Sequence, residues 1–253
     1  MRPRIEGESR QAGRIAPRAG ERRGRARRSG RTIGTLGVGG IGLVTLLLIA
    51  APAFAGIHTW VAPYSGGTIT NSPTTWATGC GSMTWPTAPT ASLVTGVAKV
   101  DAKATACGGT YGTDNTEAGL FEGPYTCVAP CATGVHVVVF SWTITWTYQM
   151  NCTGTGGINN QFGVVGEVDS LANSTISGYA KVQINWLSAT CPHTASGGAT
   201  KQSVTVGLTS QFNTGWSYLF ESFLFIEVYV STTGTGVSEV NVPTATLNSI
   251  VLS

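Results

Sequence analysis

The stretch FSWTITWTYQM, residues 140–150, decides the fold of this chain. Large apolar side chains fill its even-numbered positions from Phe140 to Met150, and hydroxyl or amide side chains fill the odd-numbered ones. Successive side chains of a β-strand point to opposite faces of a sheet. The alternation therefore predicts a strand that buries one face in a core and turns the other toward solvent.

Weaker alternation recurs in two later segments, each of which is expected to bury one apolar face. The first face consists of Ala180, Val182, Ile184 and Trp186, and the second of Val204, Val206 and Leu208. Further strands are expected at residues 57–62, 93–104, 162–169, 216–232, 237–242 and 245–252. Turns rich in Gly, Ser and Thr are expected at 153–157, 196–198 and 233–236.

No segment after residue 56 shows a helical apolar stripe, and the abundant Thr and Val favour a pleated surface. We therefore predict an all-β fold. The expected architecture is an antiparallel β-sandwich, Ig-like or jelly-roll-like, with about nine strands and disulfide stabilisation.

Residues 63–90 contain four prolines, at positions 63, 73, 86 and 89. Proline has no amide hydrogen to donate to a neighbouring strand. We expect this segment to be mostly irregular and to cover an edge or a face of the sandwich.

Charges are divided unevenly along the chain. Eleven of the 15 Lys and Arg residues, all of them Arg, lie within residues 2–31. The 198 residues from Gly56 onward contain four Lys, no Arg and nine acids, which is a net charge of −5. A nucleic-acid-binding domain needs a basic surface that displaces counterions from phosphates, so nucleic acid is excluded as a partner.

The scarcity of Lys also limits how many carboxylates gain stability from ion pairs. Stability of that kind is lost when acid protonates the carboxylate. Since little of it is available here, we expect the protein to tolerate acid, with a melting temperature that is nearly constant from about pH 3 to pH 7.

Residues 1–55 have the layout of a secretory signal peptide. An Arg-rich region precedes an uncharged apolar run over residues 32–50, and small residues follow at Ala53 and Ala55. We expect cleavage after Ala55, leaving residues 56–253 as a single β-sandwich domain that is secreted or displayed on the cell surface. The alternative is an uncleaved anchor, because about 20 apolar residues span a bilayer. Membrane contact is expected only in that case.

All six cysteines lie in the part expected to be exported. An even number of cysteines on the oxidising side of a membrane predicts three disulfides. Strand directions favour the pair Cys152–Cys191, and pairing of nearest neighbours in the sequence would complete the set with Cys80–Cys107 and Cys127–Cys131. The alternative is a metal site formed by Cys127, Cys131, Cys191 and His193, although this spacing fits no common zinc pattern.

Residues 216–230 form the most apolar stretch after the signal. On a strand, one face would be buried and the other would present Glu221, Phe223, Phe225, Glu227 and Tyr229. Such an aromatic strip requires cover from the Pro-rich segment, from a partner subunit or from a planar ligand such as a sugar ring. This face is the candidate binding surface.

Catalytic residues are not evident from the sequence, so we predict none. Glu167 and Asp169 share one face of an expected strand about 7 Å apart, which permits an acid pair of the kind a glycosidase uses. Residues 114–117 form an acidic stretch that we expect to be a turn, with oxygen ligands suited to calcium. His136 is expected to be structural, at a strand end or in the core.

Cleavage after Ala55 would create a free N-terminus of sequence Gly56-Ile57-His58. The amine, two deprotonated amides and the His58 imidazole can hold Cu(II) in a square plane. No other cofactor is expected. A visible absorption band of the Cu(II) adduct that persists in His58→Ala would exclude this site.

Two N-glycosylation patterns, at Asn151 and Asn173, lie at expected strand ends or turns. We expect a secreted or cell-surface structural or adhesive protein, with protein subunits or a surface polysaccharide as partners. The alternatives are a carbohydrate-binding module and, less favoured, an acid-tolerant secreted hydrolase.

Overall fold

The computed structural model describes residues 57–71, 76–84 and 88–253, which belong to one compact unit over residues 50–253. These residues contain 13 strands and no helix, so none of them lies in a helix long enough to cross a membrane. Five strands are short: β1 (His58–Trp60), β2 (Gly67–Asn71), β3 (Trp76–Ala77), β4 (Ser82–Thr84) and β5 (Thr90–Ser92). Eight are long: β6 (Val97–Cys107), β7 (Thr110–Thr126), β8 (Gly134–Cys152), β9 (Gly156–Ser170), β10 (Thr175–Thr190), β11 (His193–Phe212), β12 (Ser217–Thr232) and β13 (Thr235–Leu252).

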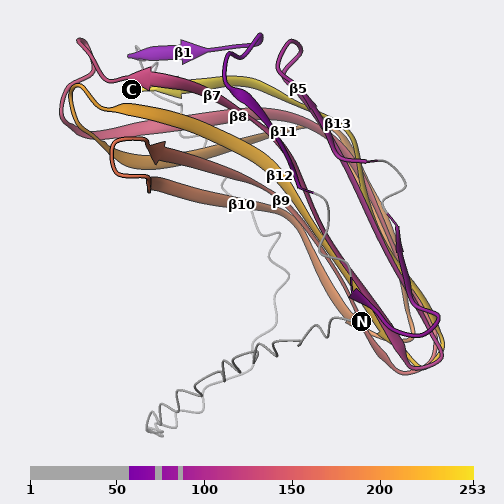
Figure 1. Ribbon diagram of the computed structural model, residues 1–253. Coiled ribbons are helices and arrows are strands. Elements are labelled where there is room, and N and C mark those ends of the chain that lie inside the picture. The colour runs from indigo at the N-terminus through magenta and orange to yellow at the C-terminus, as the bar shows by residue number, and fades with distance from the viewer. Residues whose placement is uncertain (1–56, 72–75, 85–87) are drawn as a thin grey trace, which may run out of the picture. The chain divides into compact units, whose positions relative to one another are not determined.

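The strands form two antiparallel sheets, which confirms the all-β, sandwich-like prediction (Figure 1). The seven-stranded sheet has the order β11-β8-β13-β6-β4, with β1 paired to β13 and β5 paired to β6. The six-stranded sheet has the order β10-β9-β12-β7-β2, with β3 paired to β7. Among the eight long strands, only β9 and β10 follow each other within one sheet, because every other connection passes to the opposite sheet.

The expected number of about nine strands was too low, for two reasons. Strand β7 was missed because its glycines and acids disguise the alternation of its buried side chains. The segment 63–90 was expected to be irregular, yet its described part contributes short strands to the edges of both sheets. Pro73 and Pro86 lie outside the described residues.

Two other boundaries also differ from expectation. Residues 237–242 and 245–252 form one strand, β13, because a register shift after Val242 lets the chain continue through Pro243. The turn expected at 196–198 lies inside β11, where Gly197 packs against the ring of Tyr148 and a register shift follows at Ala199.

The core lies between the two sheets and is built from alternating positions, as FSWTITWTYQM predicts. Phe140, Trp142, Ile144 and Met150 are fully or almost fully buried on the inner face of β8. The opposing face of β12 buries the even-numbered residues from Tyr218 to Val230. Burial of such large apolar side chains is the main favourable term in folding.

One buried hydrogen-bond chain joins the two sheets through this core. The indole Nε1 of Trp142 in β8 donates to Ser222 Oγ in β12 at 2.9 Å, and Ser222 Oγ donates to the Val165 carbonyl of β9 at 2.7 Å. Both side chains are buried, so water is not a substitute partner. The position of one sheet over the other is therefore set by a directional contact as well as by packing.

The three expected disulfides are present: Cys152–Cys191, expected from strand direction, and Cys80–Cys107 and Cys127–Cys131, expected as nearest neighbours in the sequence. The metal alternative is therefore wrong, because Cys127, Cys131 and Cys191 are not thiolates. A disulfide stabilises mainly by restricting the unfolded chain, which for loops of the size closed by Cys80–Cys107 and Cys152–Cys191 amounts to about 3–4 kcal/mol.

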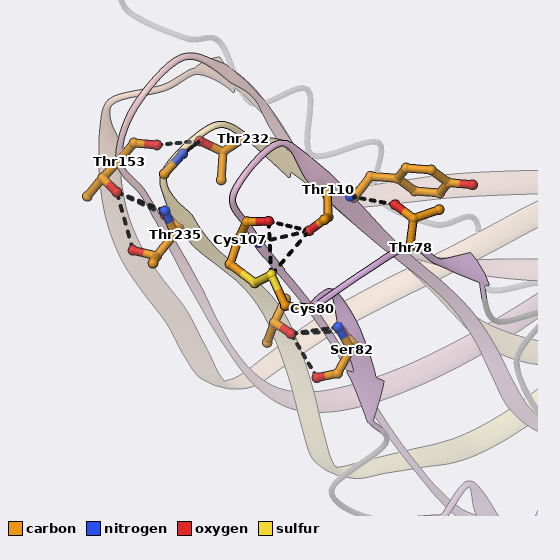
Figure 2. The surroundings of a disulfide bond; sticks show 11 residues. Thr78, Cys80, Ser82, Cys107, Thr110, Thr153, Thr232 and Thr235 are labelled. Atoms are coloured by element: carbon orange, nitrogen blue, oxygen red, sulfur yellow. Dashed lines mark hydrogen bonds between the residues drawn. A yellow bond between two sulfur atoms is a disulfide. The ribbon is translucent and has the colours of Figure 1, made fainter.

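Figure 2 shows how threonines surround the Cys80–Cys107 disulfide. Thr110 Oγ1 donates to the Cys107 carbonyl at 2.6 Å and accepts from the Cys107 amide at 3.0 Å. At the same end of the sandwich, Thr153 Oγ1 accepts from the Thr235 amide at 3.0 Å. The turns β6–β7, β8–β9 and β12–β13 are thus held by hydroxyl contacts.

The acidic segment 114–117 is a strand and not a turn, which corrects the calcium hypothesis. It lies in β7, where Asp114 and Thr116 are fully buried between the sheets while Asn115 and Glu117 face outward. Side chains that point to opposite faces cannot share one cation. Thr116 Oγ1 donates to Asp114 at 3.2 Å, and the other carboxylate oxygen has no hydrogen-bond partner.

Burial raises the pKa of Asp114 to about 6, against the hydrogen bonds that favour its charged form. Burial, followed by the charge of Glu239, raises the pKa of Asp101 to about 6 as well. A carboxyl whose pKa is raised by folding favours the folded state when it is protonated. Its contribution is complete below the unfolded pKa and is lost as the pH rises through the folded pKa. Because of these raised pKa values, we now expect the melting temperature to change with pH above about pH 5.

We predict that replacing Ser222 with Ala lowers the free energy of unfolding by about 1–3 kcal/mol, because the buried Trp142 Nε1 then lacks an acceptor. Urea denaturation measures the loss. Ser203→Ala, on the exposed outer face of β11, is the control and should change it by less than about 0.5 kcal/mol. Equal effects of the two substitutions would contradict the role given to Ser222.

We predict that the melting temperature rises by several degrees between about pH 7.5 and pH 5, as the raised carboxyls take up protons. Asp114→Asn should raise the melting temperature at pH 7.5 and make the rise smaller. Glu227→Gln, which changes an exposed acid, should leave the slope as in the parent protein. Calorimetry across this pH range is the measurement, and a melting temperature that falls toward pH 5 would overturn the prediction.

Candidate functional site

The candidate surface is the outer face of the six-stranded sheet, at the centre of which runs β12. The five side chains singled out in the sequence, Glu221, Phe223, Phe225, Glu227 and Tyr229, all project from this face. Their exposure increases along the strand, from half-buried Glu221 and Phe223 to exposed Glu227 and Tyr229, while Phe225 is buried.

Phe225 is buried because its ring lies flat over the neighbouring strand β9. A Cβ at Gly163 would lie 2.6 Å from the Phe225 ring, so only glycine allows this approach. The ammonium of Lys181 on β10 covers the other side of the ring, 3.7 Å from its centroid. Phe225 is therefore a buried residue that makes a cation–π contact with Lys181. It does not offer an exposed ring to a ligand.

The two most exposed aromatic side chains of this face come from the edge strand β10, and one of them differs from the sequence-based prediction. Trp186 was expected in the core, but it is 67% exposed on the outer face. The cause is a β-bulge between Gln183 and Asn185, where one extra residue on β10 exchanges the two faces of the strand. Asn185 turns inward at this point and donates to the buried Asn160.

Tyr179 lies on the same outer face of β10 and is 56% exposed. With Trp186 and Tyr229 it gives the face three exposed aromatic side chains. Hydrogen-bonding groups lie between them: the strand register places Trp186 opposite Gln161, and Gln161 opposite Glu227. No local pattern in the sequence identifies Trp186 as exposed, because the bulge depends on how β10 pairs with β9.

Carboxyl groups gather beside the aromatics. Glu167 and Asp169 project from β9 two residues apart, as expected, and the register places Glu221 of β12 directly opposite Glu167. Burial raises the pKa of Glu167 to about 7, with further increases from the charges of Asp169 and Glu221. The pKa of Glu221 is raised by burial and then by Asp169, and that of Asp169 is raised by burial.

His58, proposed to bind Cu(II), lies at the start of β1 and contacts Trp60, with ring centroids 4.2 Å apart and ring planes tilted by 57°. The rest of that hypothesis lies outside the described residues, because Gly56 is not among them. Across residues 57–71, 76–84 and 88–253, no group of three or more His, Cys, Asp or Glu side chains is arranged to hold a metal ion.

The two glycosylation candidates are both exposed. Asn173 lies in the turn between β9 and β10, where Thr175 Oγ1 donates to its side chain at 2.7 Å. Asn151 lies near the end of β8 and accepts from Thr194 Oγ1 at 3.2 Å. His136 is at the start of β8, with Nε2 2.8 Å from the Ala132 carbonyl, which agrees with a structural role.

A depression of about 570 Å³ lies on the outer face of the other sheet. It is lined by Thr147, the half-buried Tyr148, Gln149, Thr194, Ala195, Ser196, Gly197 and Glu239. It is open and contains no exposed large aromatic side chain, so it offers less to a ligand than the aromatic face.

Comparison of the chain with protein-family models, with curated proteins and with solved structures finds no match. The geometry of the outer face is therefore the basis of the functional proposal below.

We predict that Glu221→Gln lowers the pKa of Glu167, because it removes one of the neighbouring charges that raise it. Carboxyl ¹³C chemical shifts followed through a pH titration measure this pKa. Glu239→Gln, on the other sheet, should leave it in place. A Glu167 pKa that does not respond to Glu221→Gln would show that the two carboxyls do not interact.

Proposed function

We propose that this protein is a secreted or cell-surface β-sandwich protein that binds polysaccharide through the outer face of its six-stranded sheet. The observation that carries the proposal is the exposure of Trp186 and Tyr179 on the same face as Gln161 and Glu227. A pyranose ring offers an apolar C–H face and a rim of hydroxyls. Exposed aromatic rings beside amide and carboxylate groups complement both.

The three disulfides support export, since such bonds persist in oxidising compartments. The exposure of Trp186, Tyr179 and Tyr229 on one face supports a binding role, because exposed aromatic rings gathered beside polar groups are typical of ligand-binding surfaces. Adhesion to a surface polysaccharide follows directly from such binding.

We also infer that the sandwich is of the jelly-roll type. Eight long strands divide into two sets of four, β11-β8-β13-β6 and β10-β9-β12-β7, and six of their seven connections pass between the sheets. Eight strands in two sheets built from Greek-key connections define that architecture. An Ig-like sandwich, in contrast, has seven or nine strands.

We predict that Trp186→Ala weakens polysaccharide binding about tenfold, which corresponds to the loss of one aromatic stacking contact. Retention on insoluble cellulose, chitin and β-glucan, and mobility in gels that contain soluble polysaccharides, measure it. Trp216→Ala, in the loop before β12, is the matched control and should bind as the parent protein does. Absence of binding to every polysaccharide, or equal binding by Trp186→Ala, would overturn the proposal.

A further inference from the structure

We propose that the polysaccharide bound by this face carries protonated amines, as an amino-sugar polymer does. This inference rests on the proposed function and concerns its ligand. Two observations support it. Negative charge is concentrated on this sheet, and the strand register places an exposed aromatic ring beside carboxyl groups.

The outer face of the six-stranded sheet collects most of the negative charge of the described chain. Five of the nine acids found after residue 56 project from it: Glu117, Glu167, Asp169, Glu221 and Glu227. Lys181 is the only Lys or Arg in the strands of this sheet. On the seven-stranded sheet, by contrast, Glu239 is paired with Lys103 at 3.0 Å. Among the described residues, the aromatic face therefore carries more carboxyls than its one Lys can pair with.

Three of these carboxyls lie close together with no cation between them. Glu221 stands opposite Glu167 on the adjacent strand, where neighbouring Cβ atoms are about 5 Å apart. Asp169 follows Glu167 on the same face. Like charges at this distance repel one another, and protonation of Glu167 relieves part of the repulsion. A ligand ammonium would relieve it more fully, since it adds a positive charge and three donors.

Strand register places an exposed aromatic ring next to this cluster. Tyr179 on β10 lies opposite Glu167 on β9, which in turn lies opposite Glu221 on β12. A sugar ring stacked on Tyr179 would have its substituents one strand spacing, about 5 Å, from the first carboxyl. An amine on that ring could therefore reach Glu167 while the ring keeps its aromatic contact.

The protein itself already places an ammonium on this face. Lys181, between Tyr179 and Trp186 on β10, holds its Nζ 3.7 Å from the Phe225 ring centroid. Lys181 thus neutralises part of the charge of this face through the buried Phe225. It leaves Glu167, Glu221 and Asp169 without a basic partner, so a second ammonium has to come from outside the chain.

An amino-sugar polymer fits these features better than a basic peptide does. The exposed side chains of Tyr179, Trp186 and Tyr229 offer ring faces, and Gln161 and Asn115 offer amides suited to hydroxyls. A Lys-rich peptide would use the carboxyls but would leave the amides without a matching set of hydroxyls. A neutral polysaccharide would leave the carboxyl cluster unpaired, and an acidic one would be repelled by it.

The test compares chitosan oligosaccharides with their N-acetylated counterparts, which have the same backbone without the charge, and with alginate oligosaccharides as the acidic probe. Binding is measured calorimetrically at pH 6 in low salt. We expect the amine form to bind at least tenfold more tightly than the N-acetylated form, and alginate to bind least. The preference should shrink as salt is raised, because salt screens exposed charges.

Glu221→Gln should reduce the preference for the amine form severalfold, whereas Glu239→Gln on the opposite sheet should keep it. Circular dichroism and the melting temperature establish that both variants are folded. Tyr179→Phe serves as a second variant, because it retains the ring and should retain the preference.

Each result has a distinct meaning. Equal affinity for the amine and N-acetylated forms overturns this inference and leaves the proposed polysaccharide function intact. Binding of none of these oligosaccharides overturns this inference, and absence of binding to cellulose, chitin and β-glucan as well overturns both. Binding of oligolysine that depends on Glu221, in the absence of oligosaccharide binding, also overturns both and identifies a basic protein segment as the partner.

Discussion

The buried contact between Trp142 and Ser222 is the constraint on which the arrangement of the two sheets depends. Apolar packing alone permits one sheet to slide over the other, because the hydrophobic effect has no direction. A hydrogen bond in a dry core permits only a narrow range of positions, since moving its partners apart leaves a buried donor unsatisfied. The relay from Trp142 through Ser222 to Val165 links β8, β12 and β9. These are the strands that carry the core and the candidate site.

The position of β12 over β8 also determines which side chains of β12 face outward. Its even-numbered residues enter the core, so its odd-numbered residues must face outward together with the outer faces of β9 and β10. Glycine at 163 lets Phe225 lie flat, and the bulge in β10 turns Trp186 outward. The resulting surface combines exposed aromatic rings with several carboxyl groups, although charged residues are scarce in this chain.

The scarcity of charged residues shapes the stability of the fold as well. Where few ion pairs are available, disulfides and hydroxyl contacts tie down the turns, as at Cys107 and Thr110. The buried acids Asp101 and Asp114 contribute in the opposite sense from an ion pair, because they favour the folded state when they are protonated. Acidic surroundings would therefore suit this domain.

The sequence by itself determined the all-β class, the buried and exposed faces of β8 and β12, and the three cysteine pairs. Each of these follows from alternation along a single strand, from the direction of successive strands or, for two of the cysteine pairs, from nearness in the sequence. The tertiary structure alone decided that residues 114–117 are a strand, that Trp186 is exposed, and that Tyr179, Glu167 and Glu221 lie in one row. The physical reason is that a bulge, a buried carboxyl and a cross-strand neighbour are properties of pairing between distant segments. The intrinsic preferences of the residues concerned leave that pairing open.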